Sequence, residues 1–203
     1  MVDFSLYLIS NRQQLAPGRT LLEVLEAALQ GGVPTIQLRE KDLPTDQLYR
    51  LAKELRRLTL EYSAKLLINE RVDLALAVAA DGVHLPGNSL PIPIARKLLG
   101  PQRLIGISTH HLDEIDRACQ QGADFVTFGP VFSTPSKASY GPPQGLAALR
   151  EACRISSIPV FALGGVKAEQ KTEIRNSGAA GIALISAILT ADNPTAAVRS
   201  FLC

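Results

Sequence analysis

Short hydrophobic segments recur along the chain and alternate with longer stretches of helical periodicity. The segments are nearly continuous in hydrophobic residues, which is typical of parallel strands buried on both faces. We expect eight such strands, at residues 6–9, 35–38, 66–68, 82–85, 104–107, 125–128, 160–163 and 181–185.

The stretches between these segments carry hydrophobic residues at intervals of three and four, as in residues 21–28. Several of them are followed by glycine, for example Gly122 and Gly178, and a glycine at this place predicts the end of a helix. The pair Asn193–Pro194 predicts the start of the last helix, because asparagine caps a helix and proline fits its first turn.

Eight strand–helix units in 203 residues predict an α/β fold, a (β/α)8 TIM barrel that forms a single compact domain over residues 1–203. The alternative is an open doubly wound sheet, which usually has fewer strands. A dinucleotide-binding sheet would carry a glycine-rich loop after its first strand. This chain has Ser10-Asn11-Arg12-Gln13 there, which favours the barrel.

Composition narrows the class of partner. With 21 Lys+Arg against 19 Asp+Glu, the formal charge is +2, which gives no indication of a nucleic acid or a membrane surface as partner. No segment has the length of a membrane span, and we see no signal peptide. Cys119, Cys153 and Cys203 lack metal-site spacing and read as reduced thiols of a cytoplasmic protein. A homo-oligomer stays open, since small barrels often associate.

Polar residues that follow a barrel strand point into the active site, so the chemistry is sought there. Gln37, Arg39 and Lys41 alternate after the second strand and can share one face. Two cations at the mouth of a barrel suit a polyphosphate. The alternative is that Arg39 and Glu40 form an ion pair that closes the rim.

Further candidates follow the next three strands. Glu70 could bind a divalent metal, or it could simply complement the dipole of the following helix. We expect His84 to be packed and hydrogen-bonded rather than catalytic, and Ser108 to face the centre. One of His110 and His111 is expected to cap the next helix.

The last two strands end in Gly164-Gly165 and in Ile185-Ser186, the usual place of a phosphate site in a barrel. Glycines permit close approach of the backbone to an anion, although a plain turn would also explain them. The loop 129–145 carries Lys137 among hydroxyl residues. It reads either as an anion clamp or as a solvated loop of turn-forming residues.

The chain resembles the thiamine-phosphate synthase family, which includes the thiazole tautomerases. The resemblance runs almost end to end and rests on LYLIS, IQLREK, LLINE, ADGVHL, GISTHH, GADFVTFGPVFSTPSK, LGGV and ISAI, in the family's order. It implies a transferase that joins 4-amino-5-hydroxymethyl-2-methylpyrimidine diphosphate to thiazole phosphate or its carboxylate. Thiamine phosphate and pyrophosphate would form with the help of Mg²⁺.

The resemblance also implies roles for individual residues. Gln37 would read the aminopyrimidine, Asn69 would contact the pyrophosphate, and Ser108 would lie beside the reacting centre. Glu70 would be the metal ligand. The positive charges that stabilise the leaving group would come from Arg39, Lys41 and Lys137. The thiazole phosphate would be bound by Thr134, Ser136, Gly165, Ile185 and Ser186.

Two departures from the synthase pattern matter. Synthases usually carry Asp where this chain has Glu70, and a second metal-binding Asp where it has Ser89. Tautomerases also lack the second Asp, but they usually have a histidine in place of Pro130. The strand-two residues and Pro130 favour the synthase. A tautomerase, or a non-catalytic protein that binds thiazole phosphate, is the alternative.

Overall fold

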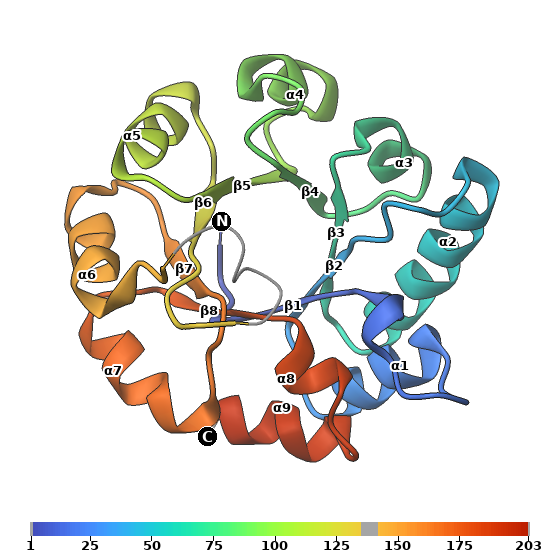
Figure 1. Ribbon diagram of the computed structural model, residues 1–203. Coiled ribbons are helices and arrows are strands. Elements are labelled where there is room, and N and C mark those ends of the chain that lie inside the picture. Colours follow the sequence, from blue (N-terminus) through green and yellow to red (C-terminus); the bar gives the residue numbers. More distant parts are fainter. Residues whose placement is uncertain (1, 135–141, 203) are drawn as a thin grey trace.

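Eight parallel strands close into a barrel in chain order, each hydrogen-bonded to its neighbours and β8 to β1 (Figure 1). The computed structural model describes residues 2–134 and 142–202. The strands are β1 (Leu6–Ile9), β2 (Thr35–Leu38), β3 (Lys65–Asn69), β4 (Gly82–Leu85), β5 (Leu104–Thr109), β6 (Phe125–Phe128), β7 (Val160–Leu163) and β8 (Gly181–Leu184). The predicted (β/α)8 barrel is confirmed, and the ends of every predicted strand lie within two residues of the observed ends.

Helices form the outer ring around this barrel (Figure 1). They are α1 (Leu21–Gln30), α2 (Thr45–Glu61), α3 (Val72–Ala77), α4 (Ile92–Leu99), α5 (Leu112–Gln121), α6 (Gly145–Ile155), α7 (Lys171–Asn176), α8 (Ser186–Leu189) and α9 (Pro194–Leu202), with short 3-10 turns η1 (Arg12–Gln14) and η3 (Ala168–Gln170). The last helix packs against the first, where the Thr195 hydroxyl donates to the Ala27 carbonyl oxygen at 2.7 Å. Among the described residues, no helix has the length and apolar character needed to cross a bilayer.

Local signals explain where the helices begin and end. Thr20 and Glu23 form a capping box at the start of α1. Gly122 adopts a left-handed conformation, with φ of 83°, directly after α5. At the other end of the chain, the Asn193 side chain accepts a hydrogen bond from the backbone N–H of Ala196, as the sequence predicts for the start of α9.

Two hydrophobic clusters fill the fold. Aliphatic side chains pack between the strands and the outer helices. A separate cluster inside the barrel is built around the rings of Phe4, Tyr7, Phe125 and Phe161, whose centroids lie 5.2 to 6.3 Å apart. This aromatic packing fills the interior of the barrel toward the amino ends of the strands. Open space for a ligand therefore lies at the carboxyl ends of the strands.

Candidate active site

A cavity of about 540 Å³ opens at the carboxyl ends of the strands. Most of the residues that line it are polar and come from the ends of β1 to β6 and from the loops that follow. They are Asn11, Gln14, Gln37, Arg39, Lys41, Asn69, His84, Asn88, Ser108, Thr109, His110 and Thr127. The cavity therefore lies where the fold of a barrel enzyme places its active site.

Gln37, Arg39 and Lys41 all line this cavity, as their alternation after β2 predicts. The Gln37 side chain is buried, and its Nε2 donates a hydrogen bond of 2.8 Å to the hydroxyl oxygen of Tyr7. Burial raises the pKa of Tyr7 well above its ordinary value, so the phenol is neutral at physiological pH. The Gln37 amide is thus held by a buried neutral partner.

Glu40 fastens the loop after β1 to the loop after β2. Its carboxylate accepts hydrogen bonds from the Ser10 hydroxyl at 2.6 Å and from the backbone N–H of Arg12. The Arg12 guanidinium binds Asp42 through both carboxylate oxygens. Burial raises the pKa of Glu40. The rim ion pair considered above exists, but Glu40 forms it with Arg12 instead of Arg39, whose side chain lines the cavity.

His84 is buried and packed, as the sequence predicts, and it also forms part of the cavity wall. Its Nε2 lies 3.0 Å from the Ser108 hydroxyl oxygen, and its ring contacts Tyr7 and Phe125. Burial, with a smaller contribution from the charge of Arg39, lowers the pKa of His84 to about 3. The ring is therefore neutral in the pH range of the cell and cannot serve there as an effective general base.

The two adjacent histidines divide their roles. His111 precedes α5 at the capping position, and the Glu114 carboxylate accepts hydrogen bonds from the backbone N–H groups of both histidines. The His110 ring lies 2.6 Å from the Gly129 carbonyl oxygen through its Nδ1 and lines the cavity. The expectation that one of the two histidines begins the helix is confirmed.

A second cavity of about 110 Å³ adjoins the first. Both are lined by Gln14, His110, Gly129, Leu163 and Ile185. The second cavity brings together the residues that the sequence assigns to a phosphate, namely Thr134, Gly165, Ile185 and Ser186, with Gly164 beside them. Two compartments with different chemistry thus share one wall.

Gly164 and Gly165 have a structural reason to be glycine. Both have positive φ, at 97° and 66°, where other residues are strained. A Cβ on Gly165 would lie 2.4 Å from the Ser133 carbonyl oxygen, and one on Gly164 would lie 2.7 Å from Cα of Pro130. Close packing of the loop after β6 onto the end of β7 requires both glycines. A role of the two glycines in a tight turn is therefore compatible with a role in the binding of an anion.

Asn69 and Glu70 line a neighbouring pocket of about 220 Å³, which shares Asn69 and Lys41 with the main cavity. Glu70 is exposed and has a φ of 63°. Among residues 2–134 and 142–202, no group of three or more histidine, cysteine, aspartate or glutamate side chains is placed to hold a metal. Ser89 lines yet another pocket, of about 190 Å³.

Two predicted site residues lie outside the described residues. They are Lys137, predicted to belong to an anion clamp, and Ser136, which the family resemblance assigns to phosphate binding. Conversely, the sequence did not predict the cavity residues Asn11, Gln14 and Thr127, nor Tyr7, which does not line the cavity but accepts the hydrogen bond from Gln37. Tyr7 reads as an ordinary core residue, and Asn11 and Gln14 read as turn residues. Only their position after the first strand of a barrel could have drawn attention to the latter two.

Fold and site together define a (β/α)8 barrel with a cavity at the carboxyl ends of its strands. The pattern of the family described as thiamine monophosphate synthase matches residues 6–188. The chain is 43% identical over 192 residues to the thiamine-phosphate synthase of Clostridium novyi, covering 95% of this chain and 94% of that protein. The chain belongs to the thiamine monophosphate synthase family.

Two further relatives agree with this assignment. A protein of Geobacter sulfurreducens, itself provisionally named a thiamine-phosphate synthase, is 55% identical over 99% of this chain and 94% of its own length. The solved thiamine phosphate pyrophosphorylase of Pyrococcus furiosus superposes with a TM-score of 0.88 at 37% identity, covering 98% of this chain and 94% of that one.

Proposed function

We propose that this protein couples 4-amino-5-hydroxymethyl-2-methylpyrimidine diphosphate to thiazole phosphate, or to its carboxylate, and releases thiamine phosphate and pyrophosphate. When the carboxylate is the substrate, carbon dioxide is released as well. One observation carries this proposal at the level of the site. Two adjoining cavities, one lined by Arg39 and Lys41 and the other by Gly165 and Ser186, offer separate places for a diphosphate and a monophosphate.

The reaction breaks the bond between the pyrimidine methylene carbon and the diphosphate oxygen, and the electron pair leaves with pyrophosphate. The thiazole nitrogen then supplies the pair for the new carbon–nitrogen bond. Positive charge that is fixed beside the leaving oxygens lowers the barrier of such a step, because charge develops there in the transition state. Arg39 and Lys41, which line the cavity, are proposed to supply it, and Lys137 is assigned to the same task by the family resemblance.

Gln37 is proposed to recognise the aminopyrimidine ring. Its Nε2 donates to Tyr7, which leaves the amide oxygen and the second N–H for the cavity. An acceptor beside a donor matches the amino group and ring nitrogen of an aminopyrimidine. Ser108, which lines the same cavity and is hydrogen-bonded to His84, is proposed to lie beside the reacting carbon.

The phosphate of the thiazole substrate is assigned to the second cavity. The first turn of a helix leaves its N–H groups without intrahelical partners, and Ser186 begins α8 at the edge of this cavity. The Ser186 and Thr134 hydroxyls lie in the same wall, with Gly165 and Ile185. Ser136 completes this set by the family resemblance.

Mg²⁺ is the proposed cofactor, and the donor set fits one that is bound mainly by substrate. Asn69 and Glu70 present oxygen ligands in adjoining parts of the site. Mg²⁺ in enzymes is commonly held by one or two carboxylates together with phosphate oxygens and water. Bound beside the diphosphate, it would neutralise charge on the leaving group. Glu70 then serves as the carboxylate ligand.

A cytoplasmic location is part of the proposal. Cys119 and Cys153 are free thiols, as is usual for proteins of a reducing compartment.

The direct test is an assay for thiamine phosphate. Purified protein is mixed with the pyrimidine diphosphate, thiazole phosphate and Mg²⁺, and the product is oxidised to its fluorescent thiochrome. The proposal expects product that depends on both substrates and on Mg²⁺. Isomerisation of the thiazole carboxylate without any coupling would instead identify a tautomerase, and binding of thiazole phosphate without either reaction would identify a non-catalytic protein.

A further inference from the structure

The buried ring of His84 has two nitrogens, and they differ in their surroundings. Nε2 lies 3.0 Å from the Ser108 hydroxyl oxygen. Nδ1 is buried and has no hydrogen-bond partner among the described residues. A Cβ on Gly106 would lie 2.6 Å from this Nδ1 and 2.4 Å from a ring carbon of Phe125, so strand β5 and the aromatic cluster close off that edge of the ring.

This difference favours one of the two neutral tautomers. With the proton on Nδ1, a buried N–H would have no acceptor, which is energetically unfavourable. Orphaned buried N–H groups are rare in proteins, whereas acceptors with an unused lone pair are tolerated more often. The proton therefore belongs on Nε2, and the unpartnered Nδ1 is a bare acceptor nitrogen that faces carbon atoms.

The tautomer decides what Ser108 can do. If Nε2 carries the proton, it donates to the Ser108 oxygen, and the serine hydroxyl proton is free to be donated elsewhere. Ser108 and His84 both line the main cavity, and Ser108 is only half-buried. The free direction of the hydroxyl is thus toward the cavity.

We infer that His84 is a positioning residue that donates from Nε2 to Ser108 and so fixes the serine hydroxyl as a hydrogen-bond donor to the bound substrate. The pair resembles the nucleophile–base arrangement of hydrolases only in its distance, because the proton lies on the histidine and points toward the serine. The kinetic role of His84 rests on the proposed function, whereas its tautomer does not.

The tautomer is measured directly on the wild-type protein by NMR with 15N-labelled histidine. The chain has three histidines, and variants of His110 and His111 assign the remaining signal to His84. We expect nitrogen shifts and couplings of the Nε2–H form at neutral pH. A signal of the Nδ1–H form, or of a protonated ring, would overturn the inference even if the protein makes thiamine phosphate.

Kinetics test the positioning role. His84→Gln keeps a donor close to the place of Nε2, whereas His84→Leu removes it. We expect His84→Leu to lower kcat about tenfold with KM within about twofold, and His84→Gln to retain most of the activity. In a Ser108→Ala background, His84→Leu should cost less than about twofold, because the partner is already missing.

Equal losses from His84→Leu in both backgrounds would overturn the positioning role, as would a folded His84→Gln that is as impaired as His84→Leu. Thermal unfolding of each variant shows whether it is folded at the assay temperature. A wild-type protein that makes no thiamine phosphate would refute the proposed function, and the NMR result would still decide the tautomer of His84.

Discussion

The Gln37 amide donates from Nε2 to the hydroxyl oxygen of Tyr7 over 2.8 Å, from β2 to β1. Tyr7 belongs to the aromatic cluster inside the barrel, whereas Gln37 belongs to the cavity above it. Both side chains are almost completely buried. This bond connects the packed interior of the barrel to the group that is proposed to read the pyrimidine.

Tyr7→Phe removes this bond and keeps the ring. Without its partner the Gln37 amide can rotate, so we expect kcat/KM for the pyrimidine diphosphate to fall about tenfold, with a loss of about 1 kcal/mol in the free energy of unfolding. Steady-state kinetics and denaturant unfolding measure both. Tyr49→Phe, on the exposed face of α2, is the control and should match the wild type.

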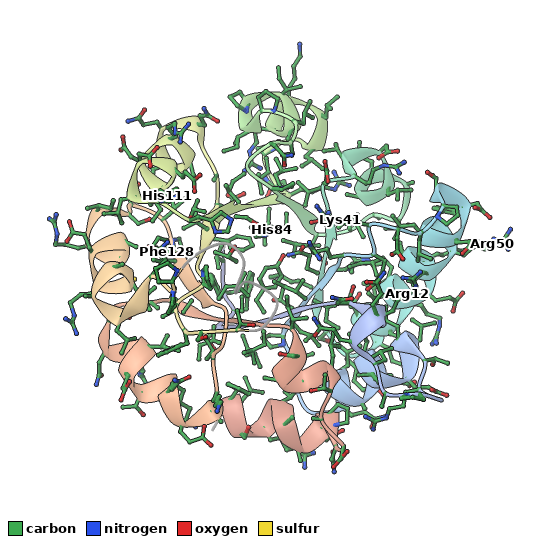
Figure 2. All side chains as sticks on the ribbon, viewed as in Figure 1. Arg12, Lys41, Arg50, His84, His111 and Phe128 are labelled. Carbon is green, nitrogen blue, oxygen red and sulfur yellow. The ribbon has the colours of Figure 1, made fainter. Side chains whose placement is uncertain are left out.

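Lys41 and Arg50 are close in the sequence, but Lys41 lines the cavity and Arg50 lies on the outer surface. Figure 2 shows Lys41 on the inner side of the ring of helices and Arg50 projecting outward from α2, with 80% of its side chain exposed. Lys41→Met should weaken the interaction with the pyrimidine diphosphate by about 1.5 to 3 kcal/mol, which corresponds to a factor of roughly 10 to 100 in kcat/KM. Arg50→Met should leave it unchanged. Equal effects of the two substitutions would refute a specific role for Lys41.

Glu40 makes the free energy of unfolding depend on pH. Burial raises its pKa in the folded state above the ordinary value of 4.5. The folded protein therefore binds this proton more tightly than the unfolded chain does, and stability falls as the pH rises from about 4.5 through the folded-state pKa. The difference in free energy of unfolding between wild type and Glu40→Gln should shift in favour of the wild type as the pH is lowered through this range.

Unfolding measured at a series of pH values tests this claim, because all other titrating groups cancel in the difference. A difference that is independent of pH would show that Glu40 has an ordinary pKa. A shift of opposite sign would show that its hydrogen bonds from Ser10 and Arg12 outweigh the effect of burial.

Gly165 and Gly18 both have positive φ but differ in the space around them. A Cβ on Gly165 meets carbonyl oxygens of Ser133 and Phe132, whereas one on Gly18 meets nothing within 4 Å. Gly18→Ala should cost about 1 to 2 kcal/mol of stability, from backbone strain alone. Gly165→Ala should cost a further 1 to 3 kcal/mol or so from overpacking, and should raise KM for thiazole phosphate. Equal stability losses would mean that the loop after β6 yields without cost.

Two buried threonine hydroxyls lack hydrogen-bond partners among the described residues, at Thr127 and at Thr35. Thr127 lines the cavity, whereas Thr35 begins β2 at the opposite end of the barrel. Valine in either place removes an unsatisfied polar group, so we expect stability to be unchanged or to rise by about 1 kcal/mol. Only Thr127→Val should lower kcat/KM. Full activity of this variant would show that the hydroxyl does not contact substrate.

The fold could be predicted from the sequence because its strands are buried on both faces. Such strands read as continuous hydrophobic segments, and eight of them with helical stretches between have few arrangements. The observed strands extend beyond the predicted ones where polar residues continue a strand, as at Asn69 in β3 and at Ser108 and Thr109 in β5. These residues pair in the sheet but face the cavity.

The site could be predicted in part, because position after a barrel strand already places Gln37, Arg39 and Lys41. The partners of these residues could not. Tyr7 lies thirty positions before Gln37, on the neighbouring strand, and His84 and Ser108 also lie on neighbouring strands. Only the register between these strands brings each pair together. The wall shared by the two cavities is likewise a property of packing between the loops, which hydrophobic patterns do not encode.

A crystal structure of the protein with thiamine phosphate, pyrophosphate and Mg²⁺ tests the proposed function and its two phosphate sites most directly. We predict pyrophosphate beside Arg39, Lys41 and Asn69, and the phosphate of thiamine phosphate beside Gly165 and Ser186, with the new carbon–nitrogen bond between them near Ser108. Phosphate groups bound in the opposite compartments, or products bound outside the two cavities, would contradict it.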